Sequence, residues 1–98
     1  MTMLEVLVTP TFAKGLKKLH AKDKIIVDKA VKAIASDPTI GEEKKGDLAG
    51  IFVHKFKINK QEVLLAYQPQ PDKSQPISLL LLSFGGHENF YSELKRQR

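Results

Sequence analysis

Residues 79–91 read LLLLSFGGHENFY, and this stretch contains the clearest structural signal in the chain. A short apolar run that stops at two glycines is typical of a buried strand followed by a sharp turn. We therefore expect a strand over residues 77–84 and a short helix that starts near His87. Such a turn holds side chains that transfer protons or form hydrogen bonds at the rim of a rigid sheet. The candidate site residues there are His87, Glu88, Asn89 and Tyr91.

Residues 51–58 are predicted to form a strand whose two faces differ in character. Side chains alternate across a strand, so every second residue shares a face. One face carries Phe52, His54, Phe56 and Ile58, and the other carries Ile51, Val53, Lys55 and Lys57. The second face places two lysines beside apolar side chains, a combination that favours a groove for phosphate groups.

The segments between these two strands predict an antiparallel arrangement. Residues 59–61 are typical of a tight turn, and residues 62–68 are apolar on both faces in their middle, as expected for a central strand. Residues 68–76 contain three prolines and predict an exposed hairpin loop. Because short connections join them, the consecutive strands must be mostly antiparallel.

The first forty residues predict one strand and two helices. Residues 3–8 are apolar and partly β-branched, which favours a strand. Thr9 is a good N-cap for a helix over residues 10–20. A second helix is expected to be capped by Asp23 and to end before Pro38, because the residue before a proline is disfavoured in the α conformation.

Together these elements predict a single α+β domain of two layers over residues 1–98. We expect the N-terminal strand and the helical hairpin to pack on a mostly antiparallel sheet of about four strands, with a short C-terminal helix at the end. The charged stretch over residues 40–50 is expected to be a solvated loop. A chain of 98 residues can bury one modest core, which agrees with one domain.

Composition narrows the class of protein. Hydrophobic residues make up 42% of the chain and charged residues 28%, which is typical of a globular protein. The absence of cysteine excludes disulfides and thiolate metal sites. No apolar run approaches the ~20 residues of a membrane-spanning helix, so a cytoplasmic location is expected. The net charge of +5 favours polyanionic partners: nucleic acid, the ribosome, a membrane surface or an acidic protein.

The order of these elements and several motifs resemble the RelE/ParE toxin superfamily of bacterial toxin–antitoxin systems. The resemblance covers nearly the whole chain. Its segments are GEEKKGDLAG at 41–50, VHKF at 53–56, LLAY at 64–67, HENFY at 87–91 and LKR at 94–96. The superfamily contains RelE-like toxins, which cut messenger RNA in the ribosomal A site, and ParE-like toxins, which poison DNA gyrase without hydrolysis.

The resemblance implies a RelE-like ribosome-dependent mRNA endoribonuclease, with a ParE-like gyrase inhibitor as the alternative. Lys55 and Lys57 match paired lysines that face RNA in RelE-like members, and Tyr91 matches a tyrosine used in cleavage or base stacking. His87 is the natural general acid or base, with Glu88 as a further group for proton transfer. These matches favour the ribonuclease.

Two departures from the RelE-like pattern favour the gyrase alternative. Leu64 and the pair Gly85-Gly86 stand where relatives often carry arginines. A lysine supplies a point charge without the bidentate fork of arginine, so charge stabilisation would rest on lysines alone.

The resemblance also implies the partners of the protein. A cognate antitoxin would lay a helix or strand on the apolar surface of the sheet and helices. The other expected partners are the ribosome and mRNA, or gyrase in the alternative, and no membrane. The attacking hydroxyl belongs to the RNA, so neither a metal nor a cofactor is expected. The further residues expected to contact RNA are Lys45, Asn89, Lys95 and Arg96.

Overall fold

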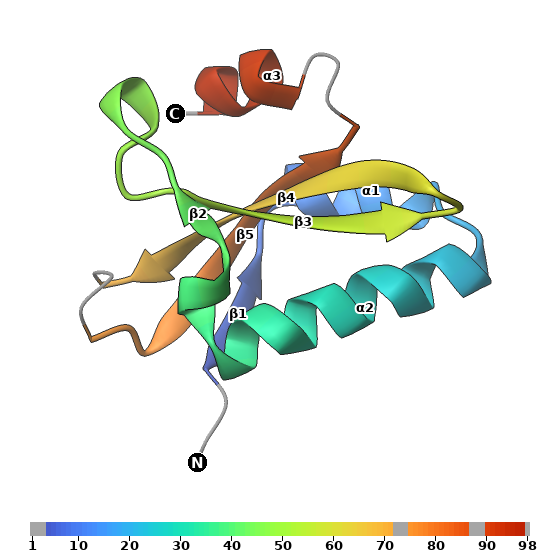
Figure 1. Ribbon diagram of the computed structural model, residues 1–98, viewed down its shortest axis with the longest axis horizontal. Helices are drawn as coiled ribbons and strands as arrows, with labels where there is room; N and C mark the ends of the chain where they lie inside the picture. The colour runs from blue at the N-terminus through green and yellow to red at the C-terminus, as the bar shows by residue number, and fades with distance from the viewer. Residues whose placement is uncertain (1–3, 72–74, 87–89, 98) are drawn as a thin grey trace.

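The computed structural model describes residues 4–71, 75–86 and 90–97. Its centre is a five-stranded sheet with the strand order β1-β5-β4-β3-β2 (Figure 1). The strands are β1 (Glu5–Val8), β2 (Glu42–Glu43), β3 (Phe52–Ile58), β4 (Gln61–Gln70) and β5 (Ser78–Gly85). β1 is parallel to β5 and the other neighbours are antiparallel, so the expected α+β class and mostly antiparallel sheet are confirmed.

The sheet has one strand more than expected. β2 contains only Glu42 and Glu43, which pair with Val53 and Phe52 at the start of β3. The prediction that residues 40–50 form only a loop was therefore wrong. Two charged residues give no apolar signal, and β2 is held by the backbone ladder rather than by burial.

β4 is longer than expected because it continues through Pro69 to Gln70. The loop predicted over residues 68–76 is therefore shorter than its three prolines indicated. Pro69 is buried and lies opposite Leu79 on β5, whereas the ladder between β4 and β3 ends at Tyr67. Proline is tolerated there because no described strand lies on the other side of Pro69, so its missing N–H leaves no ladder bond unmade.

Two helices, α1 (Pro10–Lys17) and α2 (Ala21–Ser36), cover one face of the sheet (Figure 1). The Oγ1 of Thr9 accepts a hydrogen bond from the backbone N–H of Phe12 at 3.3 Å, so the predicted cap of α1 is confirmed. The prediction that Asp23 caps the second helix was wrong. The helix already begins at Ala21, with His20 at the N-cap position, and Asp23 lies in its first turn.

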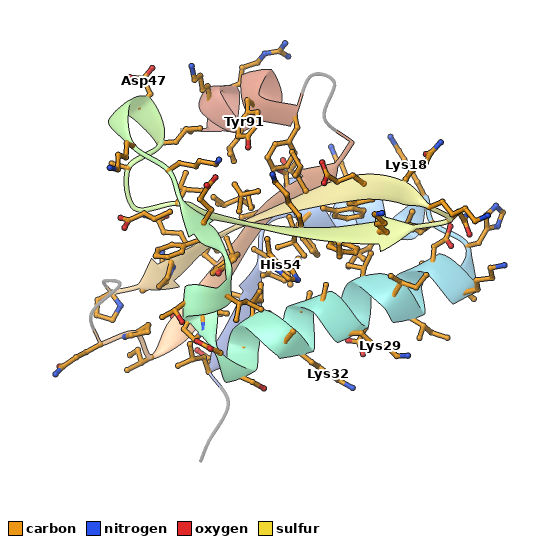
Figure 2. All side chains as sticks on the ribbon, viewed as in Figure 1. Lys18, Lys29, Lys32, Asp47, His54 and Tyr91 are labelled. Atoms are coloured by element: carbon orange, nitrogen blue, oxygen red, sulfur yellow. The ribbon has the colours of Figure 1, made fainter. Side chains whose placement is uncertain are left out.

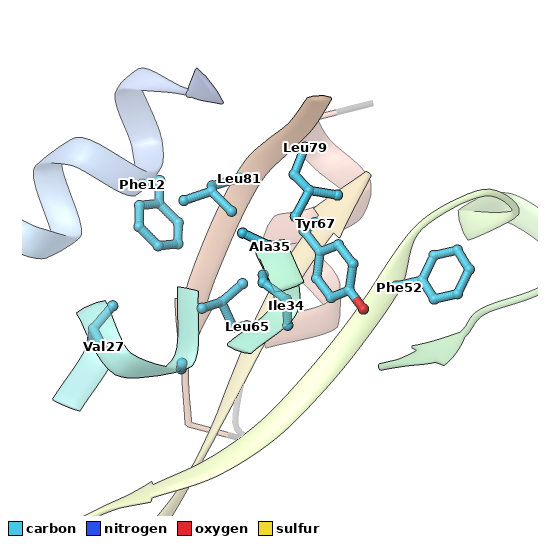
Figure 3. Packing of buried hydrophobic residues seen from close by; sticks show 10 residues of the cluster. Phe12, Val27, Ile34, Ala35, Phe52, Leu65, Tyr67, Leu79 and Leu81 are labelled. Carbon is cyan, nitrogen blue, oxygen red and sulfur yellow. The ribbon is translucent and has the colours of Figure 1, made fainter. Parts of the chain in front are cut away.

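The main hydrophobic core lies between this helical pair and the sheet (Figure 3). Phe12 is 1% exposed and makes an edge-to-face contact with Phe84, with ring centres 5.0 Å apart. The other buried members come from α2 and from three strands: Val27, Ala30, Ile34, Ala35, Phe52, Leu65, Tyr67, Leu79 and Leu81. Phe52 is on this face, as the alternation along β3 predicted.

A smaller core lies on the opposite face, beneath α3 (Phe90–Gln97). Phe90 and Leu94 of this helix pack against apolar residues of the sheet and of the loop before β3. The partners are Leu48, Ile51, Val53, Leu64, Ala66 and Leu82. The predicted C-terminal helix is thus confirmed from Phe90 onward, and its predicted start near His87 lies outside the described residues. None of the helices described in the chain has the length and apolar character needed to span a membrane.

The connection from α2 to β3 is held in place by Tyr67 of β4. It contains two short 3-10 helices, η1 (Pro38–Ile40) and η2 (Gly46–Leu48). The Tyr67 hydroxyl donates a hydrogen bond to the carbonyl of Pro38 at 2.6 Å and accepts one from the N–H of Gly41 at 3.1 Å. A Cβ on Gly41 would lie only 2.4 Å from the Tyr67 hydroxyl, so glycine is required at this position. This contact fixes the start of β2.

Candidate functional site

The sheet face that carries α3 also carries the two lysines indicated by the alternation along β3. Lys55 and Lys57 are exposed, and they share this face with Val53, which is buried in the core beneath α3. Lys55 lies opposite Leu64 on β4, and Leu64 lies opposite Gly85 on β5. Since neighbouring strands are about 4.8 Å apart, the backbone of Lys55 is roughly 10 Å from Gly85 at the end of β5.

Tyr91 of α3 also lies on this side of the sheet (Figure 2). Its side chain is half-buried, and its ring meets Phe90 edge to face with the ring centres 5.0 Å apart. The Nζ of Lys44 is 5.4 Å from the centre of the Tyr91 ring, within the range of a cation–π contact. Tyr91 therefore helps to pack α3 while part of its ring stays accessible.

Lys44 is a further candidate site residue, and the sequence did not reveal it. Its Nζ donates a hydrogen bond to Glu42 Oε1 at 2.5 Å. This bond raises the pKa of Lys44 and lowers the pKa of Glu42, and the charge of Lys55 lowers the Glu42 pKa further. An ionised pair thus lies beside Tyr91. Lys44 and Lys45 end the charged run at residues 42–45, and the sequence alone does not show which of them reaches Tyr91. The pairing of β2 with β3 decides this.

The other residues predicted to contact RNA lie around this site rather than within one cluster. Lys95 Nζ lies 3.9 Å from Asp47 Oδ2, and this exposed ion pair connects α3 to η2. Arg96 and Lys45 are exposed. His87, Glu88 and Asn89 lie outside the described residues. In the part of the chain that the structure describes, no three His, Asp or Glu side chains gather into a possible metal site.

The positions at which relatives often carry arginines are either buried or open. Leu64 is 0% exposed beneath α3, where a charged side chain would have to be desolvated. A Cβ built on Gly85 or Gly86 meets no atom within 4 Å. The described cations on this face therefore come from β3, from Lys44 beside β2 and from α3, and none comes from β4 or β5.

An apolar groove lies on the other side of the sheet, between β1, α1 and α2. Its volume is about 720 Å³. Among the described strands β1 lies at the edge of the sheet and pairs with β5 alone, so its outer edge adjoins the groove. The apolar lining consists of Leu4, Val6, Val8, Phe12, Leu16, Val27, Val31, Ala35 and Leu81. Lys17, Lys24, Lys32 and Asp28 complete the wall, and Lys32 Nζ is 3.2 Å from Asp28 Oδ2.

Comparison with known families decides where this arrangement belongs. A family model described as the ParE-like toxin of type II bacterial toxin–antitoxin systems matches residues 6–95. The chain is a member of this ParE-like toxin family. The resemblance to the RelE/ParE superfamily is thereby confirmed, and the protein is a ParE-like toxin by family. Among curated proteins no match was found.

Solved structures with the same fold include RelE toxins and their complexes with antitoxins. A variant of the Escherichia coli toxin RelE with two arginine-to-alanine substitutions, in the free state, has a TM-score of 0.71 at 18% identity over 98% of each chain. The toxin–antitoxin complex RelBE2 of Mycobacterium tuberculosis has a TM-score of 0.71 at 19% identity, covering 89% of this chain and 94% of that one. The intact E. coli RelBE complex has a TM-score of 0.65 at 18% identity, covering 87% and 98%. At these identities the likeness concerns the fold of the ParE-like toxin alone.

Proposed function

We propose that this ParE-like toxin inhibits translation in the cytoplasm as a ribosome-dependent endoribonuclease of the RelE kind. The observation that carries the proposal is the placement of Lys55 and Lys57 on the sheet face that also holds Tyr91. Two exposed ammonium groups spaced along a strand suit successive phosphates of a single RNA strand. An aromatic ring beside them suits the stacking of an unpaired base.

Cleavage by the 2′-hydroxyl of RNA requires a base, an acid and a cation near the phosphate. In the proposal, Lys55 neutralises the charge that develops on the phosphate, and His87 or Glu88 transfers protons. Tyr91 orients the substrate from α3. Lys45, Asn89, Lys95 and Arg96 contact flanking phosphates. Because the nucleophile belongs to the RNA, this route uses no metal or cofactor.

Purified toxin added to a translating extract tests the proposal directly. Added toxin should produce new 5′ ends in mRNA at ribosome-bound codons. Lys55→Ala/Lys57→Ala should lower the cleavage rate roughly a hundredfold, because two charge-assisted phosphate contacts are lost. The matched control is Lys17→Ala/Lys24→Ala, which removes the same charge on the other side of the sheet and should cleave normally. Intact mRNA with the wild-type toxin would refute the ribonuclease.

A second function, inhibition of DNA gyrase without catalysis, is favoured by the buried Leu64 and the open space at Gly85 and Gly86. It predicts that the toxin leaves mRNA intact and stops gyrase from supercoiling plasmid DNA. A supercoiling assay run beside the translating extract separates the two functions. The two assays use the same preparation, so an inactive protein would be recognised by failure in both.

In either case we propose that a cognate antitoxin is the protein partner and that it binds the groove between β1, α1 and α2. An apolar trough suits the apolar face of an amphipathic helix, and Lys17, Lys24 and Lys32 at its wall suit acidic residues along the helix flank. Val31→Asp, inside the groove, should weaken antitoxin binding at least about a hundredfold because a buried unpaired charge is costly. Ala33→Asp, on an exposed part of α2, should not. Equal affinity of the two variants would place the antitoxin elsewhere.

A further inference from the structure

A second pocket opens at the edge of the sheet, beside the start of β2. β2 pairs only with Phe52 and Val53, so from His54 onward no described strand covers the outer edge of β3. An open edge presents backbone N–H and C=O groups to a ligand. The pocket has a volume of about 330 Å³ and is lined by Ile40, Glu42, Val53, His54 and Lys55. Because it lies at the edge, it is reached by side chains from both faces of β3.

His54 supplies the pocket with an uncharged hydrogen-bonding ring. It is half-buried and lies on the α2 side of the sheet (Figure 2). Its ring stacks on Phe56, with ring centres 6.0 Å apart and planes 21° apart. Burial lowers the pKa of His54 below its usual 6.5, so the ring is neutral at pH 7. A neutral imidazole has one donor and one acceptor nitrogen. Within the described residues, neither nitrogen has a hydrogen-bond partner.

Glu42 and Lys55 supply opposite charges to the same pocket. Glu42 uses Oε1 to accept the hydrogen bond from Lys44, and a carboxylate has a second oxygen with further acceptor capacity. The lowered pKa of Glu42 keeps this group ionised, so it accepts hydrogen bonds and donates none. Lys55 is exposed at the rim. Val53 and Ile40 add apolar surface.

We propose that this pocket binds one unstacked base of RNA that carries an exocyclic amino group. In this arrangement Glu42 accepts a hydrogen bond from the amino group, and the His54 ring bonds the remaining polar edge of the base. Lys55 binds the adjoining phosphate. Single-stranded RNA is read in this way, on the polar edges of bases that have left the stack. The inference deepens the proposed ribonuclease and rests on it for RNA as the physiological ligand.

The pair cytidine 5′-monophosphate and uridine 5′-monophosphate tests this assignment on the full-length protein. The two bases differ along one edge: cytosine has an amino donor at C4 and an acceptor at N3, whereas uracil has a carbonyl acceptor at C4 and an N–H donor at N3. A neutral imidazole can match either state of N3 through its choice of tautomer, so the preference tests the contact of the amino group with Glu42. Titration followed by amide NMR should shift the signals of Glu42, Val53, His54 and Lys55. Cytidine monophosphate should bind at least about fivefold more tightly than uridine monophosphate, since a matched base contact is worth ~1–3 kcal/mol. Ribose 5-phosphate should bind more weakly than either nucleotide.

Three variants separate the contributions of the lining residues. Glu42→Gln should abolish the preference for cytidine, because an amide donates as well as accepts. Its matched control is the adjacent Glu43→Gln, which lies outside the pocket lining and should keep the preference. His54→Phe keeps an aromatic ring against Phe56 and should weaken the binding of both nucleotides. A thermal unfolding curve for each variant shows that it is folded.

Several outcomes would overturn the proposal. Equal affinity for the two nucleotides, or a preference that survives Glu42→Gln, removes the role of the base. Equal shifts with ribose 5-phosphate identify a site for anions only, such as the carboxylate of a peptide.

The nucleotide titration does not depend on cleavage, so the two proposals can fail separately. Nucleotide binding without any mRNA cleavage refutes the ribonuclease and leaves the pocket. If mRNA is cleaved, Glu42→Gln should change the bases preferred at the cut. Unchanged preference, or an equal loss at all cut sites, refutes the pocket and leaves the ribonuclease.

Discussion

The two faces of the sheet are covered to very different extents. On one face, α1 and α2 together contribute 24 residues of helix and pack over the main core. On the other face, the eight residues of α3 cover the smaller core, and Lys55 and Lys57 stay exposed beside it. Regions with few packed contacts open most readily. Stability is therefore concentrated on the helical-hairpin face, and the candidate site lies on the face with the lighter cover.

Charge is divided just as unevenly. Residues 10–36 contain seven lysines and two aspartates, a net charge of +5. The other 71 residues contain nine basic and nine acidic side chains, so they are formally neutral. The whole net charge thus resides on the helical hairpin, away from the candidate RNA face. The basic balance of the chain on its own therefore supports a partner at the hairpin and does not locate the site for RNA.

The largest expected effect comes from removing an anchor of the hairpin face. Phe12→Ala deletes a ring that is 1% exposed and contacts Phe84. We expect the free energy of unfolding to fall by about 3–5 kcal/mol, because a large cavity forms in a packed core. Urea denaturation measures this loss. Ile25→Ala, at a residue 58% exposed on the same hairpin, is the control and should change stability by less than about 0.5 kcal/mol. A similar cost for both variants would contradict the assignment of the core.

The second effect tests the lighter cover. Leu94→Ala removes the fully buried anchor of α3 and should lower the free energy of unfolding by about 2–3 kcal/mol. Hydrogen exchange should accelerate in residues 90–97 well before it does in α2, because α3 can detach while the main core stays closed. Equal acceleration in both helices would show that the two faces open as one unit.

A third effect concerns Tyr67, the residue that links the main core to the start of β2. Tyr67→Phe leaves Gly41 N–H and Pro38 C=O without their partner, so we expect a loss of about 1–2 kcal/mol at pH 7. Burial raises the pKa of Tyr67 to about 12 from 10.0.

The raised pKa of Tyr67 also predicts a pH dependence. The contribution of the protonated Tyr67 phenol to the free energy of unfolding is fully present below pH 10. It falls as the pH rises from 10 to 12, because the unfolded state loses the phenolic proton first. The wild type should lose roughly 2–3 kcal/mol more than Tyr67→Phe over this range. Parallel pH curves for the two proteins, measured by urea denaturation, would contradict the buried phenol.

The smallest effect is expected at Lys44. Lys44→Gln removes the cation beside Tyr91 and the bond to Glu42, yet surface ion pairs contribute little to stability. The melting temperature should therefore stay nearly constant, while the ring protons of Tyr91 shift in the NMR spectrum. Lys45→Gln is the adjacent control and should leave the Tyr91 signals in place. Identical Tyr91 shifts in both variants would contradict the contact.

Much of the sheet was predictable because alternation along a strand is a strong local signal. Phe52 and Val53 were assigned to opposite faces correctly. Both faces of this strand are buried at these residues, and a register shift by one residue would exchange the faces of all its side chains. β2 and the start of α2 were not predictable in the same way. β2 is held by backbone pairing, and α2 begins at Ala21 without a side-chain cap bond.

The candidate site was predictable only in part. The spacing of Lys55 and Lys57 placed them on one face directly. The positions of Lys44 and of the edge pocket depend on where β2 begins and ends. Its start is set by contacts distant in sequence, including the hydrogen bond that the N–H of Gly41 donates to the Tyr67 hydroxyl. His54 likewise reaches the pocket because β2 begins only at Glu42, opposite Val53, and does not extend beside His54. Alternation alone assigned His54 only to the apolar face of β3.

The parallel pairing of β1 with β5 has a consequence for synthesis of the toxin on the ribosome. Glu5 lies opposite Ser78, so the first strand must wait for more than seventy further residues before it finds its neighbour. At ~5–20 residues per second this delay is roughly 4–15 s. The groove that takes Leu4 and Val6 from one end of the chain and Leu81 from the other cannot exist earlier. A partner that recognises this groove therefore binds chains whose synthesis has passed β5 and does not bind shorter nascent chains.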